Sequence, residues 1–278
     1  MREWVAEQDE YVEAGLIAPK TVNNALGVLV ACLNQAVEDG LVAANPAARV
    51  QRLPLEPNER DWLRLHEIDL YLDSCSDVYR PLAATLVGTG MRISEALALR
   101  WAHIELERGA IRVYRSRRGQ SEGATKGRRF RAVDIGPGLV ATLRDLKARQ
   151  AEHLTVDPPE SYAFAMPVRR RKSDLGRWAS KPEGQPMDRS TVSRSWHKAA
   201  LEDASLRDMS LHALRHTAAA SWLMTGKPLM YVQRQLGHAS ITTTESFYGH
   251  LEESFLKDAA ASTEVAIRAA RAELDPLA

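Results

Sequence analysis

Apolar residues recur at α-helical spacing along several stretches of this 278-residue chain. Between Thr21 and Val37 they fall every three or four positions, which places them on one helix face. We expect Thr21 to cap this helix and Gly40 to end it. The same spacing predicts helices over residues 64–74, 78–87, 138–150, 189–204, 210–225, 228–237 and 252–273. A further short helix is expected to begin at Arg92, after the turn at residues 88–90.

A short region in the middle of the chain alternates instead between apolar and polar residues, as β-strands do. The expected strands are residues 104–106, 110–114 and 130–135, with a polar loop that carries Lys126 between the last two. The strands follow one another without intervening helices, so they predict a small antiparallel sheet. The predicted fold class is therefore mainly α with a small antiparallel β-sheet, an α+β arrangement.

A proline-rich stretch separates the first helical region from the rest of the chain. Residues 45–58 contain Pro46, Pro54 and Pro57 and show no periodic pattern, which is typical of an interdomain linker. We therefore expect two domains, residues 1–56 and residues 57–278.

Charge is nearly balanced over the chain, with a net value of +1 at neutral pH. A balanced charge argues mildly against a nucleic-acid partner, but its distribution matters more than its sum. Acidic residues gather toward both ends and basic residues in the middle, where two basic runs favour a track for phosphates. These runs comprise Arg112, Arg115, Arg117, Arg118, Lys126, Arg128, Arg129, Arg131 and residues 169–172.

Composition also excludes several classes of protein. No apolar run approaches membrane-spanning length, so no membrane partner is expected, and the N-terminus lacks the apolar core of a signal peptide. Only two cysteines, Cys32 and Cys75, are present, which rules out a zinc site built from cysteines alone.

Five residues combine cationic and hydrogen-bonding groups with a phenol. His212 and Arg215 lie three apart, on one face of the first turn of a predicted helix, where backbone N–H groups and the helix dipole favour an anion. Arginine donors match two phosphate oxygens at once, and Arg92 supplies a second such group. His238 follows Leu236-Gly237 at a helix end, and Tyr248 lies ten residues further. Together they indicate a phosphate clamp with a nucleophile.

Each of these residues alone has a simpler interpretation. A histidine and an arginine often share a surface helix, a histidine after a helix can bind its last carbonyls, and most tyrosines pack in the interior. The histidines also suggest a metal site, formed by His212, His216, His238 and His250. No carboxylate or other ligand at a suitable spacing accompanies them, which disfavours a metal.

Four stretches carry a resemblance to a known family: Gly88–Leu97, His212–Thr217, Leu236–Ser240 and Thr242–His250. In these motifs the chain resembles the tyrosine recombinases, also called the phage integrase family, over about residues 21–248. The resemblance implies a catalytic domain that follows a truncated helical core-binding domain, the DNA clamp. Since the stretch before the catalytic part is short, we expect weak duplex binding with a steep salt dependence.

The resemblance also implies residue roles. Arg92, Arg215, His212 and His238 would hold the scissile phosphate, and Tyr248 would attack it to form a 3′-phosphotyrosyl link and release a 5′-hydroxyl. His212 would act as general base, and Lys126, or Arg128 or Arg129 in its place, would protonate the leaving oxygen. No metal, ATP or other cofactor is implied.

The expected partner is double-stranded DNA, bound by a homotetramer that is a monomer when free, in the cytoplasm and on the nucleoid. Accessory DNA-bending or directionality factors are expected as well. The predicted helix 252–273 packs either on its own domain or on a neighbouring protomer. Two alternatives to a site-specific recombinase remain at this point: a type IB topoisomerase-like enzyme, and a DNA-binding relic that no longer cleaves.

Overall fold

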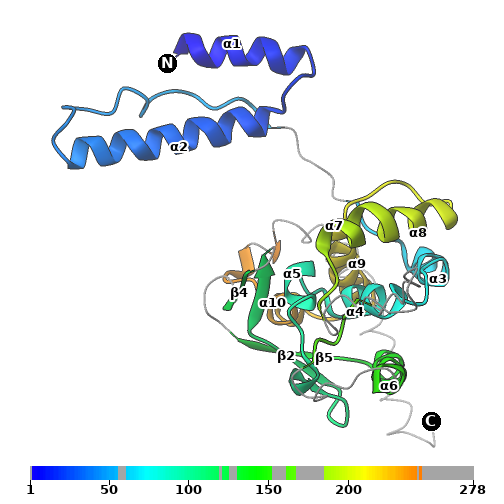
Figure 1. Cartoon of the computed structure of the whole chain (residues 1–278). Coiled ribbons are helices and arrows are strands. Elements are labelled where there is room, and N and C mark those ends of the chain that lie inside the picture. The colour runs from blue at the N-terminus through cyan, green and yellow to red at the C-terminus, as the bar shows by residue number, and fades with distance from the viewer. Residues whose placement is uncertain are drawn as a thin grey trace, which may run out of the picture. The chain divides into compact units, whose positions relative to one another are not determined.

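The computed structural model describes residues 2–55, 61–118, 121–124, 130–151, 161–166, 185–242 and 244–245. Several features predicted above lie outside these residues: Lys126, Arg128, Arg129, the basic run 169–172, Tyr248, His250 and the helix 252–273. The chain forms two compact units, Met1–Glu59 and Arg60–Ala278, which are described separately below (Figure 1).

The first unit contains two helices that contact each other, α1 (Arg2–Glu13) and α2 (Pro19–Glu38). Helix α2 begins two residues before the expected cap at Thr21. Pro19 occupies its first turn, where the fixed φ of proline suits a helix and the missing N–H costs nothing. The stretch after α2 returns to it, because the Asn23 amide bonds the backbone N–H and C=O of Leu53, each at 2.9 Å.

The helices of the second unit confirm the apolar spacing in the sequence. They are α3 (Leu65–Asp73), α4 (Arg80–Thr89), α5 (Ile93–Ala96), α6 (Pro137–Ala151), α9 (Leu211–Met224) and α10 (Leu229–Leu236). A 3₁₀ turn covers Trp101–His103. The predicted helix 189–204 is present as α7 (Arg189–Thr191), a π-helical segment (Val192–His197) and α8 (Lys198–Asp203). A π-helical turn in a helix shifts the faces on either side of it, which spacing alone does not predict.

The predicted antiparallel sheet is also confirmed. It has the order β1 (Ile104–Glu105), β2 (Ala110–Val113), β5 (Arg131–Asp134), and Ile111 lies opposite both Ile104 and Val133. The segment predicted as a loop between β2 and β5 differs from expectation. It contains a second, two-stranded sheet, β3 (Arg115–Arg118) and β4 (Ser121–Ala124).

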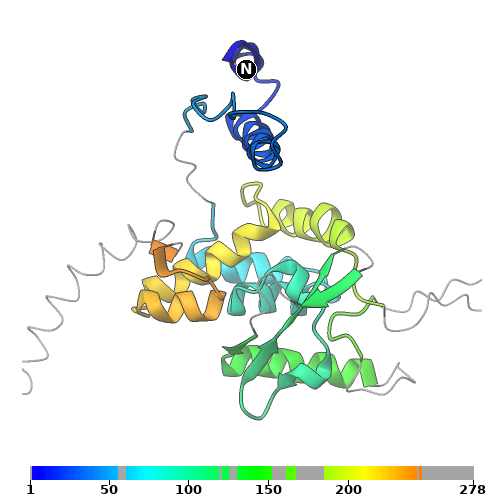
Figure 2. The ribbon, with the colours of Figure 1, turned by 90° about the vertical axis from the view of Figure 1, so that its left-hand side faces the viewer.

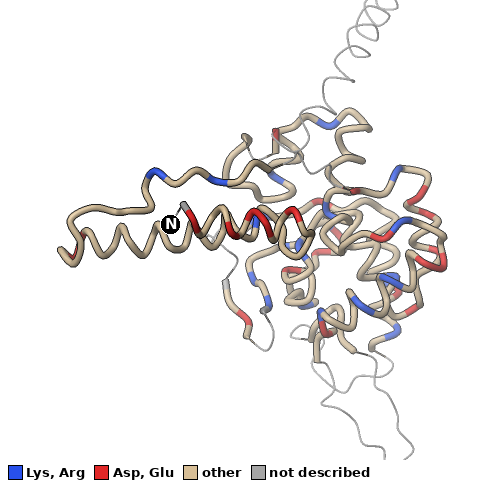
Figure 3. Tube along the Cα trace, turned by 90° about the horizontal axis from the view of Figure 1, so that it is seen from above, with Lys and Arg blue, Asp and Glu red and all other residues tan. Residues whose placement is uncertain are grey.

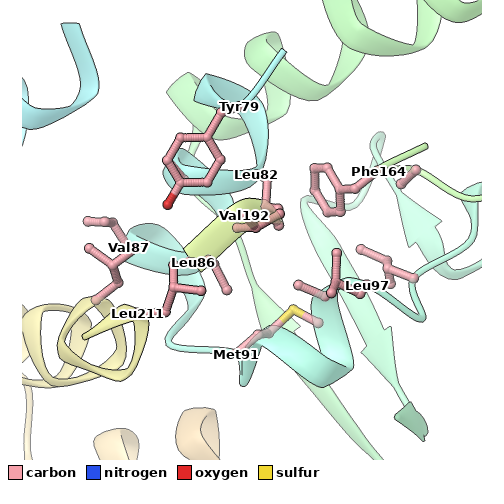
Figure 4. Packing of buried hydrophobic residues seen from close by; sticks show 14 of the residues in the cluster. Tyr79, Leu82, Leu86, Val87, Met91, Leu97, Phe164, Val192 and Leu211 are labelled. Atoms are coloured by element: carbon pink, nitrogen blue, oxygen red, sulfur yellow. The ribbon is translucent and has the colours of Figure 1, made fainter. Parts of the chain in front are cut away.

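The hydrophobic core of the second unit surrounds α4, which contacts α3, α5, α6 and α9. Tyr79 at its N-cap and Leu82 and Leu86 within it are almost fully buried. Figure 4 shows Leu82 beside Val192 and Phe164, which come from other segments. Helices α9 and α10 lie together on one side of the unit, and the three-stranded sheet lies beside α6 on another (Figure 2). The packed core therefore provides a rigid support for the segments that carry the predicted site.

Candidate active site

The turn between α4 and α5 positions Arg92. Gly90 ends α4 in the left-handed region (φ 59°), and a Cβ atom there would come within 2.6 Å of Leu236 Cδ2, so only glycine fits. Arg92 follows in an extended conformation, and its backbone N–H donates to Glu95 Oε2 at 2.9 Å. Its guanidinium also donates to Glu95 Oε1 at 3.2 Å, yet its side chain stays 42% exposed. Arg92 is therefore oriented by the protein and open to a ligand.

Glu95 is the buried acceptor beneath Arg92. Its side chain is 3% exposed and also accepts from Arg131 of β5, at 2.7 Å and 3.1 Å. Burial alone would raise the pKa of Glu95, but hydrogen bonds and charge from Arg131 and Arg92 lower it below its ordinary value. An ionised Glu95 thus binds two arginines at once.

Arg215 joins two of the predicted motifs. It lies at the start of the second turn of α9, is 3% exposed, and donates to Gly90 O at 2.6 Å and to Leu236 O at 2.7 Å. One guanidinium therefore links the turn before Arg92 to the end of α10. Ser210 stands at the expected N-cap of α9, but its side chain makes no capping hydrogen bond.

His212 lies one turn before His216 on α9. Its side chain is exposed, whereas His216 is buried, and the two rings meet edge to face with centroids 4.9 Å apart. His212 is thus placed at the surface beside the buried Arg215, on the same face of the helix, as the spacing predicted.

Helix α10 ends at Gly237, which has a left-handed φ of 68°, and His238 follows it. The last carbonyls of this helix are bound by arginines from elsewhere, Leu236 O by Arg215 and Gln235 O by Arg131 Nε at 2.9 Å. Cations are favoured at this end of a helix because the dipole is negative there. The His238 ring instead faces Thr244, with Nδ1 and Oγ1 2.9 Å apart.

Electrostatic interactions link His238 to the arginines and to His212. Burial, together with the charges of Arg215, Arg92, Arg131 and His212, lowers the pKa of His238 to about 4. The imidazole is therefore neutral at neutral pH. A cluster of like charges of this kind is suited to an anion.

The structure thus brings together Arg92, His212, Arg215 and His238. Lys126 and Tyr248 lie outside the described residues, so their positions stay predictions. Sequence reasoning missed two contributors, Arg131 and Thr244. Alternation along β5 gave a signal for the first, because Arg131 lies on the same face as the buried Val133 and an inward-facing arginine needs a buried acceptor.

The described part of the chain contains neither a metal-binding group nor a membrane-spanning helix. No group of three or more His, Cys, Asp or Glu side chains there is arranged to hold a metal ion. None of the helices described is long and apolar enough to cross a membrane.

Comparison with known proteins identifies the family. Residues 61–254 match the family model described as "Phage integrase family". The chain belongs to this family. It is 27% identical over 257 residues to the ICEBs1 integrase of Bacillus subtilis (strain 168), covering 90% of this chain and 66% of that protein. It is 29% identical over 235 residues to the tyrosine recombinase XerD of Corynebacterium glutamicum, covering 80% and 67%.

A solved structure extends the similarity to the fold. The Tn1549 transposon integrase in complex with transposon right end DNA matches with a TM-score of 0.69 and 19% identity, over 89% of this chain and 79% of that one. The chain spans about two thirds of the length of the two curated relatives. At this level of identity the structural match establishes the fold of this family member, an integrase catalytic fold preceded by helices.

Proposed function

We propose that this chain is a site-specific DNA recombinase that cleaves and rejoins strands through a phosphotyrosyl intermediate on Tyr248. The observation that carries the proposal is the convergence of Arg92, Arg215 and His238 from three separate segments around one anion-attracting site. Membership in the tyrosine recombinase family supports the same reaction.

Arg92 and Arg215 are held in position to bind a phosphodiester. Glu95 orients Arg92, and two backbone carbonyls orient Arg215, so neither guanidinium has to be ordered when DNA arrives. Donors that are fixed in advance stabilise charge that develops on phosphate oxygens in the transition state, which is the largest contribution that such a site makes. Arginine suits this role because its planar donors match two oxygens.

The chemical steps follow from these residues and the family resemblance. The Tyr248 oxygen attacks phosphorus, the bond from phosphorus to the 5′-oxygen breaks, and the 3′-phosphate stays linked to the tyrosine. His212 takes the phenol proton and Lys126 gives a proton to the departing 5′-oxygen. The covalent link conserves the phosphodiester energy, so the reverse attack by a 5′-hydroxyl rejoins a strand without ATP.

His238 contributes as a neutral donor in this scheme. Its lowered pKa keeps the ring uncharged at neutral pH. If Nδ1 accepts from the Thr244 hydroxyl, Nε2 carries the proton and can donate to a non-bridging phosphate oxygen. In this arrangement Thr244 selects the tautomer that the reaction needs.

The first unit is proposed as the DNA clamp, residues 1–56. Helix α1 is a poor surface for phosphates, since acidic positions follow one another along it (Figure 3). The basic residues of this unit lie mainly elsewhere, and Arg52 packs beside Gly27 of α2. We place the DNA contact on Lys20 of α2 and on Arg49 and Arg52 in the stretch that follows α2. We expect a tetramer to assemble on duplex DNA.

Trapping of a covalent adduct tests the reaction. The protein is mixed with nicked suicide duplexes taken from the DNA that flanks its gene, beside Tyr248→Phe as the matched control. A detergent-resistant adduct with the unchanged protein alone supports the proposal and locates the cleavage site. Duplex binding without an adduct favours the alternative, a DNA-binding relic that no longer cleaves.

A second assay separates the recombinase from a topoisomerase-like enzyme. A plasmid carrying two copies of the located site should yield exchanged products. Relaxation of supercoils without exchange, on plasmids with or without the site, would favour the topoisomerase instead.

A further inference from the structure

We infer that Arg131 is a positioning residue, which fixes Arg92 and His238 relative to each other by binding Glu95 and the end of α10 with one guanidinium. The inference rests on the proposed function, because it concerns the geometry of that site. Arg131 is not among the residues for which the sequence motifs imply a role.

The contacts of Arg131 link two segments that are far apart in sequence. Its Nη1 and Nη2 donate to the two carboxylate oxygens of Glu95, at 3.1 Å and 2.7 Å. Its Nε donates to Gln235 O at 2.9 Å. Glu95 holds Arg92 directly, and Gln235 lies three residues before His238. The strand β5 thus connects the two halves of the site through one side chain.

The guanidinium also lies against the backbone that leads to His238. A Cβ atom on Gly237 would come within 2.9 Å of Arg131 Cδ and within 3.2 Å of its Nε. Glycine at this position lets α10 end in the left-handed conformation and lets Arg131 approach closely. The direction in which the chain leaves α10, and so the position of His238, depends on this contact.

Arg131 is placed to support the site and not to bind phosphate itself. All three of its guanidinium nitrogens donate to protein acceptors, whereas Arg92 is held by one carboxylate and stays 42% exposed. Lysine is a poor substitute, because one ammonium group cannot reproduce the planar fork and the separate Nε donor. A loss of about one ångström in placement is enough to slow a reaction about 100-fold.

Arg207 offers a matched control in the same unit. It also binds both oxygens of one carboxylate, Glu67, at 2.8 Å and 3.1 Å, and it donates to a backbone carbonyl, Trp62 O. With Asp61, which Arg207 also binds at 3.3 Å, these partners lie in α3 and in the residues just before it, and none of them is a residue of the site. Comparison of Arg131→Gln with Arg207→Gln therefore separates loss of a multi-way ion pair from loss of site geometry.

The experiment measures the single-turnover rate of adduct formation, duplex affinity and the melting temperature of each variant. Both variants should melt at a lower temperature than the unchanged protein. Arg131→Gln should slow cleavage about 100-fold with duplex affinity kept, and Arg207→Gln should leave the rate unchanged. Equal rates for the two variants, or slowing that follows melting temperature, would overturn the inference.

Two further variants keep the test decisive. Arg131→Lys retains the charge and serves where Arg131→Gln does not fold; its rate should fall between those of the unchanged protein and the glutamine variant.

A double-mutant cycle with Glu95→Gln asks whether the two residues act together. The double variant should be no slower than the slower single variant. Multiplied losses would show that Arg131 acts independently of Glu95, and would overturn the positioning role.

A readout without DNA distinguishes failure of this inference from failure of the proposed function. In histidine-labelled protein, the NMR titration of His238 should move to higher pH in Arg131→Gln and stay unchanged in Arg207→Gln. If the unchanged protein forms no adduct but His238 responds in this way, only the proposed function fails. If the adduct forms and His238 does not respond to Arg131, only the inference fails.

Discussion

Two clusters of polar side chains in the second unit differ in their charge. The site cluster brings several positive charges near one another around Glu95 and leaves the side chains of Arg92 and His212 exposed to solvent. Its members are Arg92, Glu95, Arg131, His212, Arg215 and His238. The other cluster, formed by Tyr71, Tyr79 and His197, contains neutral groups and is almost fully buried. Both are hydrogen-bonded, but only the first contains charged side chains.

The neutral cluster is a complete chain of hydrogen bonds. Met209 O accepts from His197 Nε2 at 2.9 Å, so Nδ1 of that ring is the acceptor, and the Tyr71 hydroxyl donates to it at 2.7 Å. The Tyr79 hydroxyl then donates to Tyr71, also at 2.7 Å. Burial raises the pKa of Tyr71 and of Tyr79 and lowers that of His197, so every group stays uncharged.

The difference separates a structural role from a functional one. A buried polar network that satisfies all its members specifies one packing arrangement. A network that concentrates like charges is unfavourable until an anion arrives, which is how binding sites commonly differ from the remainder of a core. The comparison predicts that changes in the two clusters will affect different measurements.

The largest effect is expected from Arg215→Lys. The ammonium group cannot reach Gly90 O and Leu236 O together and lacks the fork that matches phosphate. Cleavage of a suicide duplex should fall by about 100- to 1,000-fold, as for loss of one preorganised donor. A rate within about tenfold of the unchanged protein would mean that Arg215 supports the fold without stabilising the transition state.

Tyr71→Phe should lower the stability of the protein without slowing cleavage. The change leaves the Tyr79 hydroxyl and His197 Nδ1 without their shared partner, at a cost of about 1–2 kcal/mol in the free energy of unfolding. The two atoms are already 3.5 Å apart, so a direct bond between them limits the loss. Urea unfolding measures the stability, and the adduct rate per folded molecule should not change. Slower cleavage would show that the two clusters are coupled.

Much of the fold could be predicted because apolar spacing and glycine positions determine it locally. The amphipathic pattern and Gly237 gave the extent of α10, and alternation gave β2 and β5. The β3–β4 pair was missed because charged and small residues fill it. Glu122 of β4 accepts hydrogen bonds from the Tyr162 hydroxyl at 2.8 Å and from Arg100 at 3.3 Å. These contacts join distant parts of the chain, so no local sequence pattern predicts them.

The site was predictable as a set of residues but not as a geometry. Motif resemblance singled out Arg92, Arg215 and His238, whereas their convergence depends on long-range bonds. Arg131 was missed because its partners are a carboxylate 36 residues away and a backbone carbonyl 104 residues away. Backbone acceptors leave no trace in side-chain motifs, so alternation along β5 can indicate an inward-facing arginine but not the partners that it binds.

Acid should affect the site cluster through His238. Its pKa is lowered from an ordinary value of 6.5 to about 4, so below pH 6.5 the unfolded chain takes up a proton that the native ring does not. The free energy of unfolding should therefore fall between pH 6.5 and about 4. Thermal melts across this range should fall less steeply for His238→Gln, while His66→Gln, a change at an exposed histidine of α3, should follow the unchanged protein. Parallel curves for all three would show that His238 is not the responsible group.

Inorganic phosphate should produce the smallest effect, because a free anion makes few of the contacts of DNA. If the site cluster carries unbalanced positive charge, phosphate should raise the melting temperature more than chloride at the same ionic strength. An anion at its dissociation constant adds about 0.4 kcal/mol to the free energy of unfolding. Arg92→Gln should lose most of this gain, since it removes an accessible donor whose side chain is outside the core. Tyr71→Phe should keep the full gain despite its lower starting stability, because the neutral cluster binds no anion. Equal gains in Arg92→Gln and the unchanged protein would place the phosphate elsewhere and remove the distinction between the two clusters.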